Sequence, residues 1–201
     1  MMDLQALQHL NQYDILLASR SPRRRELLKG IGINFRIVEL PEMEEVFPSV
    51  LKRHDIPVYL ARAKAQHYNS FMSEKTLLIT ADTIVWLDDE VIGKPENEED
   101  AVKMLMKLSG KMHEVFTGVC LKTFSKESVF YGSTKVFFRT LSEEEIRYYV
   151  KEYKPLDKAG AYGVQEWIGY VGVEHIEGSY YNVMGMPLQK LYAELVKIVE
   201  R

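Results

Sequence analysis

The sequence predicts an α/β fold with a mixed, largely antiparallel sheet flanked by helices. Apolar runs typical of strands alternate with segments of helical spacing, and two long strand-like segments are joined by a short turn. No repeat, low-complexity tract or linker interrupts the 201 residues, which are enough for one domain or for two lobes that share a core. We therefore expect a single domain over residues 1–201, in which residues 1–13 form an N-terminal extension.

Six strands are predicted from runs of apolar, β-branched and aromatic residues bounded by turn residues. They cover residues 14–19, 35–40, 77–87, 113–124, 128–140 and 169–176. The first is the apolar run DILLAS, and the second alternates between apolar and polar residues. The third turns back at Asp88-Asp89, and the fourth and fifth form a hairpin. The sixth lies within a stretch rich in Gly and Tyr, residues 155–185.

Five helices are predicted from apolar residues at helical spacing and from capping residues. They begin at Ser21-Pro22, Pro57, Asn97, Ser142 and Pro187. The first has Ser as its N-cap and Pro at its first position, and Gly30 or Gly32 can end it. The second follows an acidic loop over residues 42–49, the third ends at Ser109-Gly110, and the fourth opens on the capping box SEEE. The last has leucines along one face.

The composition excludes several classes of protein. Hydrophobic residues make up 46% of the chain and charged residues 27%, which is typical of a globular protein. The net charge of −3 excludes a chain that holds nucleic acid or an anionic membrane through bulk positive charge. Cys120 is the single cysteine, so no internal disulfide can form. Because the apolar runs are too short for a membrane span and the N-terminus does not resemble a signal peptide, we expect a cytoplasmic protein with no membrane partner.

Four arginines lie where the first predicted strand meets its helix, in Ser19-Arg20-Ser21-Pro22-Arg23-Arg24-Arg25. Backbone N–H groups and the helix dipole favour an anion at such a place, and arginine adds paired donors suited to phosphate oxygens. The alternative is a solvated basic first turn. Without an anion, however, each positive charge there costs about 0.3–1 kcal/mol. This cost favours a phosphate site.

Asp82 lies among aliphatic residues in the middle of the predicted strand 77–87. Aspartate is unfavourable inside strands, and a buried carboxylate must be paired, hydrogen-bonded or bound to a metal. It is either a functional carboxylate or a structural one that accepts hydrogen bonds from backbone amides or an arginine. The residues alone leave these two interpretations equal.

Three lysines are weaker candidates: Lys64 on a predicted helix, Lys94 in GKP and Lys158 in DKAG. Each alone is more often a solvated surface lysine, although the Gly and Pro beside Lys94 restrict its backbone. The absence of GxxxxGK[ST] and GxGxxG motifs excludes P-loop enzymes and dinucleotide dehydrogenases, and no GxSxG motif is present. The histidines lack metal-ligand spacing, and Cys120 has no catalytic signature.

Six segments of the chain resemble the Maf family of nucleotide pyrophosphatases. In chain order they are LASRSPRR at 17–24, ADT at 81–83, GKP at 93–95, LSGK at 108–111, DKAGAYGVQ at 157–165 and IEGSYYNV at 176–183. Each match alone is weak, but six in the family's order are highly specific. The resemblance begins at residue 14 and covers nearly the whole chain after it.

The resemblance implies a fold like that of inosine-triphosphate pyrophosphatases, with an elongated mixed sheet and two lobes around a nucleotide cleft. It implies hydrolysis of a nucleoside triphosphate to the monophosphate and pyrophosphate with a divalent cation, Mg²⁺ or Mn²⁺. The form DKAGAY followed by Gln165 is similar to the branch that acts on dTTP and UTP. It also implies a house-cleaning role against non-canonical nucleotides, and it is compatible with a homodimer.

By motif position, the resemblance gives Asp82 the catalytic acidic role and makes Glu45, with Asp82, the holder of the metal. Glu42 and Glu44 in the same acidic segment are alternatives to Glu45. Water would attack the α-phosphorus. Asp82 either deprotonates this water or holds the metal that acidifies it. An unperturbed aspartate, with a pKa of about 3.9, is a weak base at pH 7, which favours metal-assisted activation.

The remaining site residues are also implied by motif position. Those at specificity-linked positions are Arg23, Thr83 and Gln165. Those that are candidate phosphate or nucleotide contacts are Ser19, Arg24, Lys64, Lys94 and Lys158. The Gln165 amide offers a donor and an acceptor that match the edge shared by thymine and uracil, although a loop glutamine can equally bond the backbone. The chain departs from the family pattern at Arg20 and at Glu166-Trp167, where many relatives have glycine.

Two other functions are compatible with the same residues. One is a hydrolase for modified nucleotides that differs only in its base pocket. The other is a non-hydrolytic nucleotide- or nucleic-acid-binding regulator of cell division, although the overall charge argues against stable nucleic-acid binding. The presence of both Asp82 and Glu45 favours an enzyme that acts on a nucleoside triphosphate.

Overall fold

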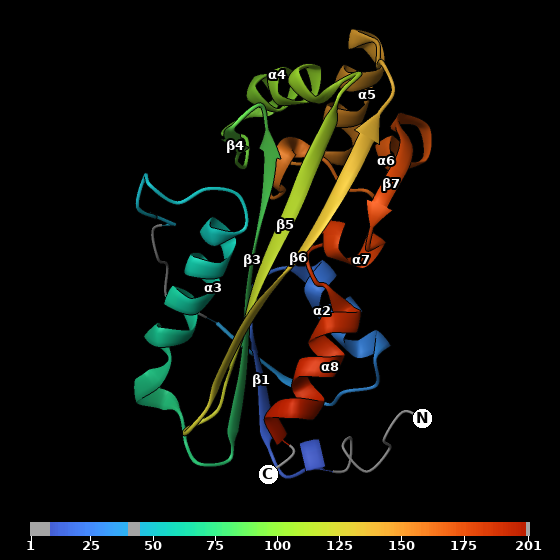
Figure 1. Ribbon diagram of the computed structural model, residues 1–201. Helices are drawn as coiled ribbons and strands as arrows, with labels where there is room; N and C mark the ends of the chain where they lie inside the picture. The colour runs from blue at the N-terminus through green and yellow to red at the C-terminus, as the bar shows by residue number, and fades with distance from the viewer. Residues whose placement is uncertain (1–8, 40–44, 200–201) are drawn as a thin grey trace. The chain divides into compact units, whose positions relative to one another are not determined.

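The computed structural model describes residues 9–39 and 45–199 (Figure 1). The chain divides into two compact units. Unit 1 comprises Met1–Asp82, Thr117–Gly132 and Gly185–Arg201, and unit 2 comprises Thr83–Phe116 and Ser133–Met184. This division does not test whether residues 1–201 form a single domain, and that statement stays a prediction. Within the predicted extension, residue Leu10 is buried.

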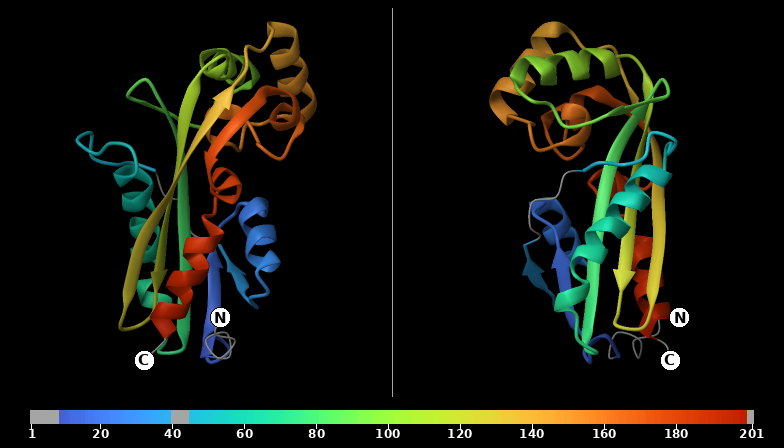
Figure 2. Two further views of the ribbon diagram at one scale, coloured as in Figure 1. Left: turned by 45° about the vertical axis from the view of Figure 1, so that its right-hand side comes forward. Right: turned by 90° about the vertical axis from the view of Figure 1, so that its left-hand side faces the viewer.

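The secondary structure of unit 1 is built around parallel strands. Its own elements are β1 (Asp14–Ala18), α2 (Pro22–Gly30), β2 (Arg36–Val38), α3 (Asp55–His67), a 3₁₀ turn (Asn69–Phe71) and α8 (Leu188–Val199). Three long strands have residues in both units: β3 (Thr76–Leu87), β5 (Met112–Lys122) and β6 (Glu127–Phe138). In unit 1, α3 covers one face of the strands, and α2 and α8 cover the other (Figures 1 and 2).

The first strand of unit 1 lies between two parallel neighbours. β1 pairs with β2 on one side, where Ala18 faces Val38, and with β3 on the other, where Ala18 faces Thr80. The chain passes from β1 to β2 and then returns through α3 to β3 on the other side of β1. In open α/β sheets, ligands bind beyond the carboxyl ends of strands at such a reversal of strand order. Ser19 and the arginines that follow it therefore occupy a favourable place for ligand binding.

Helix α3 lies close to the sheet because the residues between them are small. Ala61 and Ala65 of the helix pack with Leu78 and Cys120 of the strands in one buried cluster. A Cβ added at Gly118 of β5 would lie 2.3 Å from the carbonyl carbon and oxygen of Pro57. Gly118 therefore permits the approach of β5 to the first turn of α3.

Unit 2 has its own apolar core. Its elements are β4 (Glu90–Ile92), α4 (Glu98–Leu108), α5 (Glu143–Tyr153), a 3₁₀ turn (Ala159–Ala161), α6 (Trp167–Gly172), β7 (Val173–Gly178) and α7 (Tyr180–Val183). Buried side chains of β3, α4, β6 and α5 form one cluster. His113 lies beside this core with its Nε2 atom 2.8 Å from the Tyr162 hydroxyl, and burial lowers the pKa of His113 to about 3.

The predicted α/β fold with a mixed sheet is confirmed. The seven strands found in residues 9–39 and 45–199 form one sheet in the order β2-β1-β3-β5-β6-β7, with β4 paired to β3. The β1–β2 and β1–β3 pairs are parallel, the β3–β4 and β6–β7 pairs are antiparallel, and β5 and β6 form the predicted hairpin. None of the helices in the described part of the chain has the length and apolar character needed to cross a membrane.

The element boundaries differ from the predictions mainly in two places. The helix predicted to begin at Pro57 begins at Asp55. The strand predicted over residues 169–176 is wrong in its first part, because Trp167–Gly172 is helical and the strand covers Val173–Gly178. The Gly169 N–H donates to the Glu166 carbonyl over 2.9 Å, and a Cβ at Gly169 would lie 1.8 Å from the Val164 carbonyl oxygen. The glycine thus allows a tight helical turn.

We predict that Gly118→Ala destabilises the protein, because the added methyl group meets backbone atoms that cannot move independently. The expected loss is about 1–3 kcal/mol of unfolding free energy, as for other overpacked sites, measured by urea denaturation. Gly30→Ala is the matched control, because a Cβ at that position meets no atom within 4 Å. Equal stability of the two variants would contradict the close approach at Gly118.

Candidate functional site in unit 1 and its counterpart in unit 2

The centre of the candidate site is one lysine ammonium that faces two carboxylates. Lys64 of α3 places its Nζ atom 2.5 Å from Oδ1 of Asp82 in β3 and 2.9 Å from Oε1 of Glu45. The side chains of Asp82 and Lys64 are only 8% and 13% exposed, whereas that of Glu45 is 41% exposed. All three residues belong to unit 1. The buried carboxylate expected at Asp82 is therefore present, and its partner is a lysine.

The periodicities of strand and helix explain this pairing. Thr80 and Asp82 are two positions apart on β3, so their side chains lie on the same face of the sheet. The Thr80 hydroxyl donates to the Ala61 carbonyl of α3 over 2.6 Å, which fixes the helix over that face. Lys64 follows Ala61 by three residues, about one helical turn, and its ammonium therefore reaches Asp82.

The electrostatics of Asp82 are dominated by its burial. Burial raises the pKa of Asp82 above the ordinary value, and the nearby charge of Glu45 raises it further. The positive charges of Lys64 and Arg24 oppose this effect. A buried carboxylate without a partner is unfavourable, so Lys64 is what allows an acidic group to be kept at this position. The raised pKa makes Asp82 a stronger proton acceptor than an exposed aspartate.

The predicted basic segment forms the beginning of α2. The Ser21 hydroxyl caps the helix by accepting from the Arg24 N–H over 3.5 Å, and the Ser19 hydroxyl accepts from the Ser21 N–H over 3.2 Å. The first turn contains no acidic residue. Arg23 lies in this turn, where its charge contributes to lowering the pKa of Arg24. The arrangement keeps cationic side chains at the positive end of the helix, which favours an anionic ligand.

Arg24 also connects the basic turn to the strand that carries Asp82. Its Nη1 atom donates to the Ala81 carbonyl over 2.7 Å, and its Nε atom donates to the Gly185 carbonyl over 2.9 Å. Burial lowers the pKa of Arg24, and the Asp82 charge opposes this effect. Arg24 therefore holds β3 directly beside Asp82, a contact that the sequence did not predict.

The structure divides the predicted site residues between the two units. Those in unit 1 are Ser19, Arg23, Arg24, Glu45, Lys64 and Asp82. Those in unit 2 are Thr83, Lys94, Lys158 and Gln165. The alternatives Glu42 and Glu44 lie outside the described residues. Direct contacts join Glu45, Lys64 and Asp82, and electrostatic interactions join Arg24 to them.

Of the unit 2 residues, Thr83 lies in β3, and the other three lie in loops. The Gly160 N–H donates to the Gly93 carbonyl over 2.9 Å, which brings the loop that follows Lys158 beside the segment that contains Lys94. Lys94 is exposed, whereas Lys158 is buried. The Oε1 atom of Gln165 is buried and has no hydrogen-bond partner among the described residues.

The oxygen donors in unit 1 fit a divalent cation. Two carboxylates, from Glu45 and Asp82, converge on the Lys64 ammonium, so a positive charge is already held between them. Mg²⁺ is commonly held by one or two carboxylates together with substrate phosphates and water. Among the described residues, no group of three or more His, Cys, Asp or Glu side chains could hold a metal ion. The donor set therefore fits a cation that is completed by a phosphate ligand.

Comparison with known proteins gives the chain its family. A HAM1 protein from Coxiella burnetii has a similar solved structure, with a TM-score of 0.49 and 14% sequence identity over 92% of this chain and 99% of that chain. A protein named "dTTP/UTP pyrophosphatase" from Bacteroides thetaiotaomicron is 57% identical over 96% of this chain and 100% of its own length. A protein of the same name from Porphyromonas gingivalis (strain W83) is 50% identical over 94% of this chain and 96% of its own length. The model of the family described as "Maf-like protein" matches residues 14–198, and the chain therefore belongs to the Maf-like protein family.

Proposed function

We propose that this chain is a nucleoside triphosphate pyrophosphatase that hydrolyses dTTP and UTP to the monophosphate and pyrophosphate. The observation that carries the proposal is the Lys64 ammonium, which contacts both the buried Asp82 carboxylate and the Glu45 carboxylate, and the charge of Arg24 in the basic first turn of α2 acts on both carboxylates. The relatives named dTTP/UTP pyrophosphatase match the chain over nearly its full length. A house-cleaning role against non-canonical nucleotides is part of the proposal.

The cations of the chain bind the triphosphate. A protein with a net charge of −3 needs a local concentration of positive groups to hold a polyanion. Arg23 and Arg24 supply guanidinium groups that can each donate two hydrogen bonds to phosphate oxygens. In unit 1, Lys64 adds a compact ammonium group, and Lys94 of unit 2 stays a predicted phosphate or nucleotide contact. Ser19 contributes a hydroxyl group as a further phosphate or nucleotide contact, and Thr83 stays a residue at a specificity-linked position.

Glu45 and Asp82 would hold a divalent cation, Mg²⁺ or Mn²⁺. When bound, such a cation neutralises phosphate charge and acidifies a water ligand. Lys64 stabilises both carboxylates in the absence of the nucleotide. With a divalent cation held by Glu45 and Asp82, the Lys64 ammonium would become available to bind a phosphate oxygen.

The chain's residues assist the hydrolysis by moving a proton and binding the leaving group. The oxygen of a water molecule attacks the α-phosphorus, and the bond from the α-phosphorus to the bridging oxygen breaks. Pyrophosphate leaves with the electron pair of that bond, and the cationic side chains stabilise its charge. The water proton passes to a carboxylate oxygen of Asp82, whose raised pKa suits this role.

Gln165 recognises the base. The amide group donates from its nitrogen and accepts at its oxygen, which complements the O4 atom and the N3–H group shared by thymine and uracil. A buried amide oxygen without a protein partner is unfavourable, and an N–H donor from a ligand would relieve this cost. The same edge of cytosine has the opposite donor and acceptor pattern.

The proposal also covers assembly, location and two alternative functions. The resemblance to the family is compatible with a homodimer, and the sequence predicts a cytoplasmic location. A hydrolase for modified nucleotides would use the same phosphate-binding residues, and a non-hydrolytic regulator would bind nucleotide without releasing pyrophosphate.

The deciding experiment is a pyrophosphate-release assay over canonical and modified triphosphates, with Mg²⁺, with Mn²⁺ and with a chelator. We expect release from dTTP and UTP that depends on the cation. We expect Asp82→Asn to lower kcat for dTTP by about 100-fold or more, because general base catalysis contributes about 10²–10⁴.

Asp14→Asn is the matched control, because it makes the same chemical change in unit 1 at the first residue of β1, where Asp14 pairs with the exposed Arg36. We expect this variant to retain normal turnover. Near-normal turnover of Asp82→Asn would contradict both roles given to this residue. No release from any triphosphate would favour the regulator.

We further predict that Gln165→Ala weakens the preference for dTTP over CTP, because the variant no longer reads the base edge. The measurement is the ratio of kcat/KM for the two nucleotides, which should fall by about tenfold or more from the loss of hydrogen-bonded discrimination. If the ratio stays at the wild-type value, Gln165 does not read the base.

A further inference from the structure

We infer that Glu166 is a positioning residue that sets the nucleotide selectivity of this chain by fixing the turn that carries Gln165. The inference rests on the proposed function, because it assigns the support of a base-reading residue. Glu166 directly follows the segment DKAGAYGVQ, at a position where the chain departs from the family pattern. The resemblance to the family therefore gives Glu166 no role. All residues in the argument belong to unit 2.

The carboxylate of Glu166 has partners on both of its oxygen atoms. Oε2 accepts a short hydrogen bond from the Tyr149 hydroxyl, and Oε1 lies 3.2 Å from Nζ of Lys158. Tyr149 is fully buried in α5, and the side chain of Glu166 is 20% exposed. The carboxylate therefore joins a helix of the unit 2 core to the loop that contains Lys158.

The same contacts hold the backbone of the turn. The Tyr149 hydroxyl also accepts from the Gly163 N–H over 3.0 Å, and the Glu166 N–H donates to the Gly163 carbonyl over 3.0 Å. A Cβ at Gly163 would lie 2.7 Å from Cδ of Glu166, so the glycine makes room for the carboxyl group. Both ends of the segment 163–166 are thus tied to Tyr149.

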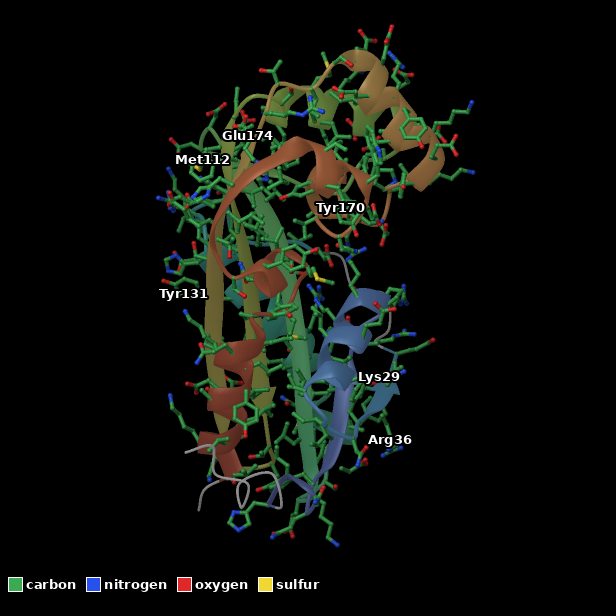
Figure 3. All side chains as sticks on the ribbon, turned by 90° about the vertical axis from the view of Figure 1, so that its right-hand side faces the viewer. Lys29, Arg36, Met112, Tyr131, Tyr170 and Glu174 are labelled. Carbon is green, nitrogen blue, oxygen red and sulfur yellow. The ribbon has the colours of Figure 1, made fainter. Side chains whose placement is uncertain are left out.

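Glu166 also begins the helix that follows. Its carbonyl accepts from the Gly169 N–H over 2.9 Å at the start of α6, whose Tyr170 projects outward from the unit (Figure 3). Gln165 therefore lies between a turn fixed by Glu166 and a helix that starts at Glu166. Within the described part of the chain, the buried Oε1 atom of Gln165 has no hydrogen-bond partner. The fixed backbone limits the positions that this amide group can occupy.

The role of Lys158 changes in consequence. Its ammonium lies 2.7 Å from Oδ1 of Asp157 and 3.2 Å from Oε1 of Glu166, and its side chain is 9% exposed. Two carboxylates offset one positive charge, which leaves little net attraction for a phosphate. The ion pairs of Lys158 instead connect the loop at Asp157 to Glu166.

The test compares Glu166→Ala, Glu166→Gln and the matched control Glu152→Gln, which alters an exposed carboxylate of α5. The first measurement is the kcat/KM ratio of dTTP to CTP. We expect Glu166→Ala to lower this ratio by about tenfold, mainly through a higher KM for dTTP. Glu166→Gln, which can still accept from Tyr149, should retain most of the ratio, and Glu152→Gln should retain all of it.

A purely structural role would lower kcat for both nucleotides equally and leave the ratio unchanged, and that result would overturn the inference. A second measurement separates it from the proposed function. Calorimetric titration with the non-hydrolysable α,β-imido analogues of dTTP and CTP reports selectivity without turnover. Loss of discrimination in Glu166→Ala supports the inference even if the wild-type protein releases no pyrophosphate. A wild-type protein that binds both analogues equally would overturn it.

Discussion

The candidate site depends on one interaction, the contact of the Lys64 ammonium with the buried carboxylate of Asp82. Without this positive charge, an ionised aspartate in the interior of unit 1 would be strongly unfavourable. With it, the acidic group is kept beside the basic first turn of α2. Glu45 shares the same ammonium. The three side chains thus form an arrangement in which two carboxylates hold one ammonium group.

In unit 1, the strand register and a few hydrogen bonds fix the positions of these charged side chains. The parallel pairing of β1 with β3 sets Ala18 opposite Thr80, so the basic segment after β1 begins level with Ala81 and Asp82. Arg24 then holds the Ala81 carbonyl, and Thr80 fixes α3 over the opposite face through the Ala61 carbonyl. Hydrogen bonds to backbone carbonyls therefore stabilise the positions of the charged groups. Such preorganisation is what electrostatic catalysis requires.

Much of the fold follows from local sequence. The capping box at Ser142 and the Ser-Pro start of α2 are confirmed because capping acts within a few residues. The strand predicted over residues 169–176 was wrong in its first part because Gly169 allows a backbone approach that no periodicity indicates.

The basic segment after β1 and the carboxylate of Asp82 were the parts of the candidate site that the residues themselves indicated. Asp82 stood out because an aspartate is rare within an apolar strand. Its partner Lys64 carried only a weak signal, because the pairing depends on how α3 crosses β3. The Arg24 contact with Gly185 joins residues 161 positions apart and had no signal in the sequence. Glu166 was visible only as a departure from the family pattern.

The most direct test of the Lys64–Asp82 interaction is a comparison of unfolding free energies at pH 8 for Lys64→Met and for Lys64→Met combined with Asp82→Asn. Removing one partner of a buried ion pair costs about 3–5 kcal/mol. If Lys64 compensates the Asp82 charge, the double variant is more stable than Lys64→Met alone, because the uncompensated carboxylate is gone. A double variant that is less stable than Lys64→Met would contradict the account.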